Sequence, residues 1–240
     1  MNVSHIRNMN TSLSSGTILY RFEPYERIVK YIQSNKLHLT NYRKFDDPWE
    51  GFVFNCYFQL SETDSQSFLG GNRIFMMCFT DECAKESDAL WRIYSDKNGV
   101  RFKTTVEKLK SILKGRSEDY YLEKMNYDNS VTDSKFFKNK GIIVSNSWDK
   151  NIIESLFYKR TYFSHEHEIR LIAWSNERDI NTEMIELDID PNDLFEEVVF
   201  DPRIDDDELK KRSAELRGLG FNKTYKSPLY KYNSVFYKCY

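Results

Sequence analysis

The central strand of the fold is predicted by residues 165–174, which read His165-Glu166-His167-Glu168-Ile169-Arg170-Leu171-Ile172-Ala173-Trp174. Residues 169–174 are apolar enough to lie inside a sheet. Side chains alternate along a strand, so Glu166, Glu168 and Arg170 are expected on one face. Charged groups at the end of a buried strand are costly unless they pair or take part in chemistry. Two hypotheses follow: an ion-pair ladder, or a catalytic glutamate beside a second glutamate that orients the substrate.

The composition indicates a globular protein with a sizeable core. The chain has 240 residues, 40% of them hydrophobic, with 17 Phe and 16 Tyr. Its 35 basic and 37 acidic residues give a net charge of -2, which argues against a protein dominated by a nucleic-acid-binding face. No apolar run approaches about 18 residues, and no secretory signal is present, so we expect a cytoplasmic protein without a membrane partner.

The cysteines predict free thiols in a reducing compartment. Cys56, Cys78, Cys83 and Cys239 form no C-x-x-C pair, and the four histidines supply no obvious complement. We therefore predict no metal site from the spacing of these residues.

Working outward from the central strand, the sequence predicts one α+β domain. Residues 1–16 are expected to be a mobile tail, and residues 17–240 a single mixed-sheet domain of about eight or nine short strands with flanking helices. The other expected strands are 17–22, 36–40, 52–60, 73–80, 99–102, 183–189, 196–200 and 222–226, with a shorter one at 141–144. The expected helices are one that begins near Pro24, 88–94, 104–128 and 206–216. Residues 131–137 are ambiguous, and 151–160 fit either a helix or a strand.

Four other sites carry candidate functional residues. Arg21 ends the first strand, where its guanidinium can bind a phosphate in bidentate fashion, although a structural ion pair explains it equally well. Thr80 ends an apolar strand and places a hydroxyl at the mouth of the sheet. Asp47-Pro48-Trp49-Glu50 is more typical of a turn than of a site. Trp91 and Tyr94 lie three apart on a helix, a spacing more typical of a core than of a stacking platform.

Several nucleotide and hydrolase motifs are absent, namely a Walker A loop, G-x-G-x-x-G and G-x-S-x-G. A magnesium-dependent nuclease using Asp47, Glu50, Glu166 and Glu168 is chemically feasible, because hard cations take oxygen ligands. Such nucleases usually carry a lysine after an acidic pair on a strand, whereas Lys159 precedes Glu166.

A series of short motifs in fixed order spans residues 17–230. They are Leu19-Tyr20-Arg21-Phe22, Asp47-Pro48-Trp49-Glu50, Cys78-Phe79-Thr80, Trp91-x-x-Tyr94 with Gly99-Val100, Lys159 with Glu166-x-Glu168-x-Arg170, and Val198-Val199-Phe200-Asp201-Pro202. Together they resemble a bacterial family of unknown function that is similar to the abortive-infection G-type proteins of phage-resistance loci. Two positions depart from the family pattern: Asp201 precedes Pro202 where a Gly is usual, and Tyr162 or Phe163 replaces a Trp.

A second resemblance concerns the order Arg21, Thr80, Glu166-x-Glu168. It is similar to the Arg–Ser–Glu class of ADP-ribosyltransferases, which use NAD as a co-substrate. The resemblance implies an ADP-ribosyltransferase-like sheet in which Arg21, with Tyr20 and Trp91, binds NAD and Thr80 supports the nicotinamide pocket. It further implies that Glu168 holds the ribose hydroxyl and that Glu166 activates the acceptor. Thr80 departs from the usual Ser-Thr-Ser, since Cys78-Phe79-Thr80 has one hydroxyl.

Three functions are therefore weighed. The first is an NAD-consuming ADP-ribosyltransferase-like effector of an anti-phage or toxin system, acting on a protein or nucleic-acid acceptor. The second is a non-catalytic sensor, or a module that binds a partner protein of a defence system. The third is the metal-dependent nuclease.

Overall fold

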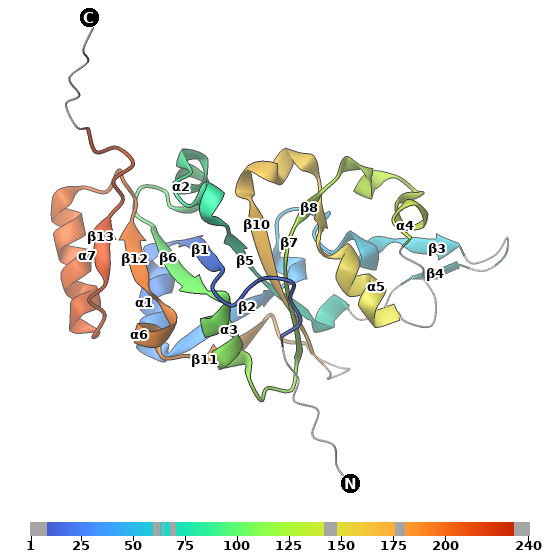
Figure 1. Ribbon diagram of the computed structural model, residues 1–240, viewed down its shortest axis with the longest axis horizontal. Helices are drawn as coiled ribbons and strands as arrows, with labels where there is room; N and C mark the ends of the chain where they lie inside the picture. The colour runs from blue at the N-terminus through green and yellow to red at the C-terminus, as the bar shows by residue number, and fades with distance from the viewer. Residues whose placement is uncertain are drawn as a thin grey trace, which may run out of the picture.

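A mixed sheet with flanking helices organises the chain in the computed structural model (Figure 1). The structure describes residues 9–59, 63, 65–67, 71–141, 148–175 and 181–232. The short strand expected at 141–144 falls almost entirely outside these residues. The predicted α+β class, with a mixed sheet of nine strands among the described residues, is confirmed.

The sheet is built around strand β5 (Ile74–Thr80). Its main path runs β11 (Met184–Asp188), β2 (Lys36–Asn41), β5, β1 (Ile18–Glu23), β6 (Val100–Thr105), β12 (Glu197–Phe200) and β13 (Thr224–Lys226). On the other edge of β5 lie β10 (Glu168–Trp174) and then β7 (Asp119–Lys124). Within this sheet the described pairs are antiparallel except β12 with β13, which are parallel.

Strand β5 is shared between two diverging partners on one edge. It pairs with β1 at Tyr20↔Thr80 and with β2 at Thr40↔Met76 and Asn41↔Phe75. On its other edge it pairs with β10 along its full length, from Glu168↔Thr80 to Trp174↔Ile74. Tyr20, Thr80 and Glu168 therefore lie side by side on three neighbouring strands.

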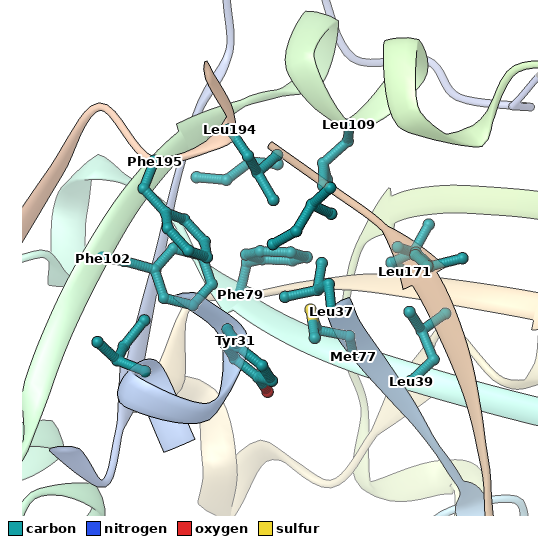
Figure 2. Close-up of a cluster of buried hydrophobic side chains, with 14 of the residues drawn as sticks. Tyr31, Leu37, Leu39, Met77, Phe79, Phe102, Leu109, Leu171, Leu194 and Phe195 are labelled. Carbon is teal, nitrogen blue, oxygen red and sulfur yellow. The ribbon is translucent and has the colours of Figure 1, made fainter. Parts of the chain in front are cut away.

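Both faces of β5 and β10 are buried, which explains why these strands are almost continuously apolar. On one face the main core is formed by residues such as Phe79 and Leu171, with side chains from α1 (Tyr25–Ser34) and α3 (Val106–Leu113) (Figure 2). On the other face Met76 and Ile172 pack with residues of α5 (Trp148–Ser155).

The remaining elements surround this sheet. Helix α2 (Asp88–Tyr94) lies near β1, and α7 (Asp206–Gly218) lies near β13. Shorter pieces are α4 (Phe136–Asn139), α6 (Pro191–Leu194), the antiparallel pair β3 (Tyr57–Gln59) with β4 (Ser65–Ser67), and the parallel pair β8 (Asn126–Tyr127) with β9 (Tyr158–Lys159). No helix among the described residues combines the length and the apolar content needed to cross a bilayer.

The helix predicted for residues 104–128 is wrong beyond its first turns. It ends at Leu113, Gly115 turns the chain at φ 79°, and Asp119–Lys124 forms β7. Tyr120 and Leu122 are buried and Tyr121 between them is less buried, a period of two that suits a strand paired with β10.

Two smaller differences concern loops. Residues 52–60, expected as one strand, begin with a 3-10 helix over Phe52–Asn55, and the strand covers Tyr57–Gln59. Residues 9–16, assigned to the tail, run beside β7: Asn10 forms a bridge with Tyr121, and Ser12 bonds the Glu123 carboxylate. Residues 151–160 contain both predicted alternatives, the end of α5 followed by β9.

Candidate functional site

A cleft of about 670 Å³ opens where β1 and β2 diverge from β5. This volume lies within the usual range for small-molecule sites. The cleft is lined by most of the residues singled out in the sequence, namely Tyr20, Arg21, Thr80, Glu166 and Glu168. The fold thus brings together side chains that are up to 148 positions apart in numbering.

Trp91 differs from the other predicted residues because it lies in the core. Its exposed fraction is 0%, and its ring packs edge-on against Phe22 with centroids 4.8 Å apart. The cleft is lined instead by its helical neighbours Leu90, Ile93 and Tyr94. The placement of Trp91 fits the core alternative weighed for it above.

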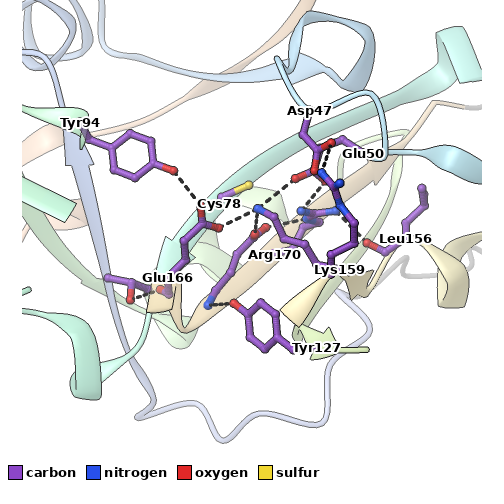
Figure 3. A network of polar contacts seen from close by, with 12 residues as sticks. Asp47, Glu50, Cys78, Tyr94, Tyr127, Leu156, Lys159, Glu166 and Arg170 are labelled. Carbon is purple, nitrogen blue, oxygen red and sulfur yellow. Dashed lines mark hydrogen bonds and ion pairs between the residues drawn. The ribbon is translucent and has the colours of Figure 1, made fainter. Parts of the chain in front are cut away.

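Four residues that line the cleft, Glu50, Lys159, Glu166 and Glu168, belong to an ion network, whose contacts are drawn in Figure 3. The Lys159 ammonium lies 2.7 Å from a Glu166 oxygen and 3.0 Å from one oxygen each of Glu168 and Glu50. The Arg170 guanidinium contacts the second oxygens of Glu168 and Glu50, both at 2.6 Å. Arg170 also donates to the Leu156 carbonyl at 2.9 Å. Three carboxylates therefore share two cations, which leaves a formal excess of one negative charge.

The local chain path explains how Glu166 and Glu168 reach the same lysine. Glu168 begins β10, but Glu166 ends a 3-10 helix over Thr161–Glu166. The prediction that Glu166 lies on the strand, on one face with Glu168 and Arg170, is therefore wrong. His167 lies between the two glutamates in the left-handed region at φ 45°, ψ 45°, and this turn brings Glu166 back over the strand end. Glu168 and Arg170 do share a face, as the alternation predicts.

The turn at Glu166 is held by two hydroxyls. Thr80 donates to the Glu166 carbonyl oxygen at 2.6 Å, and Tyr94 donates to the Glu166 carboxylate at 3.1 Å. A third hydroxyl, that of Tyr127, accepts the Glu168 backbone N–H at 2.8 Å. Thr80 therefore positions the glutamate segment from the neighbouring strand.

Electrostatics keep Glu168 ionised. Burial alone raises the pKa of its carboxyl, but Arg170 and Lys159 outweigh burial and hold that pKa well below its usual range. Burial likewise lowers the pKa of Lys159, but the Glu168 and Glu50 carboxylates outweigh it and raise that pKa above its usual value. In the same place, burial raises the pKa of the Cys78 thiol, so that it stays neutral.

Arg21, which also lines the cleft, is held by two contacts. Its Nε donates to Glu23 at 2.5 Å, and a terminal nitrogen donates to the Cys78 carbonyl at 2.5 Å. Glu23 has an exposed fraction of 2% and also accepts from Arg27 at 3.2 Å and Tyr31 at 3.3 Å. The structure thus contains the ion pair considered for Arg21 and also orients its guanidinium in the cleft.

Tyr20 lies next to Arg21 with its hydroxyl directed at another carboxylate. It donates to Glu82 at 2.6 Å, and the Arg101 guanidinium carbon lies 4.7 Å from its ring centroid. Burial, together with Glu82, raises the pKa of Tyr20 above its usual value.

The Asp47–Glu50 segment combines a turn and a site residue. Asp47 accepts the Trp49 N–H at 3.0 Å, as expected of a turn, and pairs with Arg160 at 2.8 Å. Glu50 enters the ion network. Of the four acids weighed for a nuclease, Glu50, Glu166 and Glu168 converge, but their common centre is filled by the Lys159 ammonium.

Sequence reasoning missed the central place of Lys159. A signal was present: this cation follows the aromatic pair Phe157-Tyr158 and precedes the glutamate segment by a few residues. Nothing local indicates that Glu50 reaches it, because that contact joins β9 to a loop that is distant in sequence.

The last motif, at Phe200-Asp201-Pro202, is structural. Asp201 is fully buried and pairs with Arg203 at 2.6 Å, and Arg203 donates to the Trp91 carbonyl at 2.9 Å. Ser95 also donates to Asp201. Asp201 therefore links the end of β12 to the end of α2, and it is not among the residues that line the cleft.

Comparison with known proteins gave no assignment, since neither protein-family models nor curated proteins match this chain. The geometry of the cleft and the order of its residues are therefore the features from which a function can be inferred.

Proposed function

We propose that this protein is an NAD-consuming ADP-ribosyltransferase-like effector of a bacterial anti-phage defence or toxin system. The observation that carries the proposal is that Arg21, Thr80 and Glu168, which follow the order of that enzyme class, line one cleft on three adjacent strands.

The charge of Glu168 suits the chemistry of this class. Breaking the bond between nicotinamide and ribose builds positive charge on the sugar, and a nearby carboxylate stabilises that charge. Glu168 is held ionised by Arg170 and Lys159, so its negative charge is present throughout the neutral pH range. Its position is fixed by contacts on both carboxylate oxygens, which limits reorganisation during the reaction.

Three cationic side chains of the cleft suit a dinucleotide. Arg21, Arg27 and Lys44 are among the residues that line it, and guanidinium groups bind phosphate oxygens in bidentate fashion. The contacts from Arg21 to Glu23 and to the Cys78 carbonyl hold its guanidinium in place before a ligand arrives.

Glu166 is the candidate for activating an acceptor. It lies on the turn beside Glu168, lines the cleft, and its side chain is 13% exposed compared with 2% for Glu168. The Tyr94 hydroxyl, which donates to Glu166, lies on the same side of the cleft and orients that carboxylate.

The experiment measures nicotinamide release and label transfer from labelled NAD, with protein and nucleic-acid acceptors. Nicotinamide release and label transfer should both be higher for the wild type than for Glu168→Gln, at a temperature where circular dichroism shows both proteins to be folded. Glu186→Gln, on the edge strand β11, is the matched control and should retain wild-type rates. If neither product exceeds the Glu168→Gln background, the proposal fails.

One observation favours a non-catalytic binding module. Both oxygens of Glu168 are engaged by buried cations, as in the ion-pair ladder considered for this strand. Under this alternative, Glu168→Gln lowers stability while wild-type protein neither binds NAD in calorimetric titration nor releases nicotinamide. Stability alone does not separate the two functions, because removing one partner of a buried pair is costly in either case.

A further inference from the structure

Asp81, Cys83 and His167 form a second cluster outside the cleft. One ligand atom from each, a carboxylate oxygen, a thiol sulfur and an imidazole nitrogen, lies within 4.8 Å of the other two. Asp81 and Cys83 follow the end of β5, and His167 comes from the turn before β10. The three donors therefore belong to two segments that are distant in sequence.

The backbone sets this arrangement. The Asp81 N–H donates to the His167 carbonyl at 3.2 Å, which joins the two segments. Asp81 caps a short 3-10 helix by accepting the Cys83 N–H at 2.9 Å, so the Asp81 and Cys83 side chains lie close together. The left-handed conformation of His167 places its Nδ1 3.7 Å from the same Asp81 oxygen.

The two oxygens of Asp81 have different surroundings. Oδ1 faces His167 and Cys83, while Oδ2 accepts from the Lys124 ammonium at 3.0 Å. A metal bound through Oδ1 would leave the lysine contact in place, and such outer contacts orient a ligating carboxylate. Cys83 is exposed and the His167 side chain is 47% exposed, so both can move to close the set.

We propose that Asp81, Cys83 and His167 bind a transition-metal ion of the Zn²⁺ type. Sulfur, nitrogen and oxygen donors are the ligands that Zn²⁺ prefers, at about 2.0–2.3 Å, and three protein ligands leave its fourth position open. The three ligand atoms lie within 4.8 Å of one another. Around a tetrahedral ion they would lie about 1 Å closer together than this limit.

The metal would stabilise the turn that carries Glu166 and Glu168. Asp81 follows Thr80, and His167 lies between Glu166 and Glu168, so one ion would link β5 to this turn beside the cleft. The metal site does not depend on the proposed function, since binding of the ion is measurable without NAD.

The test titrates Co²⁺ into the metal-free full chain and records visible absorption. We expect the bands of a tetrahedral thiolate-ligated ion, displaced by Zn²⁺. Cys83→Ser should remove the sulfur charge-transfer band, and His167→Ala should weaken affinity more than tenfold. Cys56→Ser and His165→Ala are the matched controls and should leave both unchanged. If the wild-type chain shows no tetrahedral thiolate spectrum, or if the spectrum survives Cys83→Ser and His167→Ala, the proposal is overturned.

A second measurement addresses the link to the turn. Amide hydrogen exchange at Asp81 and His167, whose N–H groups donate to the His167 and Ser164 carbonyls, should slow on adding Zn²⁺. If the protein binds Zn²⁺ but exchange at these two amides is unchanged, the ion does not stabilise the turn.

Discussion

Replacing Lys159 with Met tests the ion network most directly. The ammonium contacts Glu50, Glu166 and Glu168 at 2.7–3.0 Å, and the Lys159 side chain is only 10% exposed. The substitution leaves three carboxylates with Arg170 alone. Removing one partner of a buried pair costs about 3–5 kcal/mol. We therefore expect Lys159→Met to lower the free energy of unfolding by that amount at pH 8.

The pH dependence follows from the carboxylates. Without Lys159, protonation of one of the three carboxylates would remove the extra negative charge that the substitution leaves. For a group with an unfolded pKa near 4.3, this protonation costs about 5 kcal/mol at pH 8 but only about 1 kcal/mol at pH 5. In the variant the folded-state pKa of the cluster is raised, so stability is lost as the pH rises above about 4.3. In wild type the pKa of Glu168 is lowered, so its contribution is complete above that pH and is lost only below it. The deficit of the variant should therefore shrink to about 1–2 kcal/mol at pH 5.

Urea denaturation followed by tryptophan fluorescence measures both values. With a urea slope of about 3 kcal/mol/M for a chain of this size, the midpoint should fall by about 1–1.7 M at pH 8. Lys210→Met removes the exposed pair with Asp207 on α7 and should leave the midpoint unchanged. A loss below about 1 kcal/mol at pH 8, or an equal loss at pH 5 and pH 8, would show that Lys159 does not neutralise these carboxylates.

Three further predictions concern the core, a tight turn and the cleft. Trp91→Ala should lower the free energy of unfolding in urea by about 3–5 kcal/mol, because a fully buried indole leaves a large cavity, and a loss under about 1 kcal/mol would contradict its core assignment. Gly99→Ala should cost about 1–3 kcal/mol in the same assay, since an added Cβ would lie 2.6 Å from the Ser95 Cα and 2.7 Å from the Glu23 carbonyl oxygen, and a neutral result would show that this backbone can move apart. Tyr94→Phe removes the hydroxyl that donates to Glu166 and should cost only about 0.5–1.5 kcal/mol, whereas under the proposed function NAD turnover falls, and unchanged turnover would exclude this hydroxyl from the reaction.

Local periodicity was sufficient for the elements that bury a regular face. Residues 169–174 and 74–79 are almost continuously apolar because both of their faces are covered, and this pattern predicts interior strands without any knowledge of their partners. The helix that begins after Pro24 and the helix that begins after Asp205 follow from capping residues and spacing within a few positions. For these parts, neighbours in sequence contain the information.

Long-range pairing decided the rest. Residues 119–124 contain helix-compatible charges, but they form a strand because β10 offers them a partner. Glu166 lies outside the strand because His167 adopts a left-handed conformation. Thr80, on strand β5, stabilises this turn by donating a hydrogen bond to the Glu166 carbonyl.

Composition and periodicity are enough to predict the α+β class, the interior strands and the acidic and basic residues available for a site. The packing of distant segments places Lys159 among Glu50, Glu166 and Glu168, and it makes Trp91 a core residue while Tyr94 lines the cleft. A buried charge is stabilised by whichever opposite charges the fold places within about 3 Å, and such contacts between distant segments leave no local pattern in the sequence.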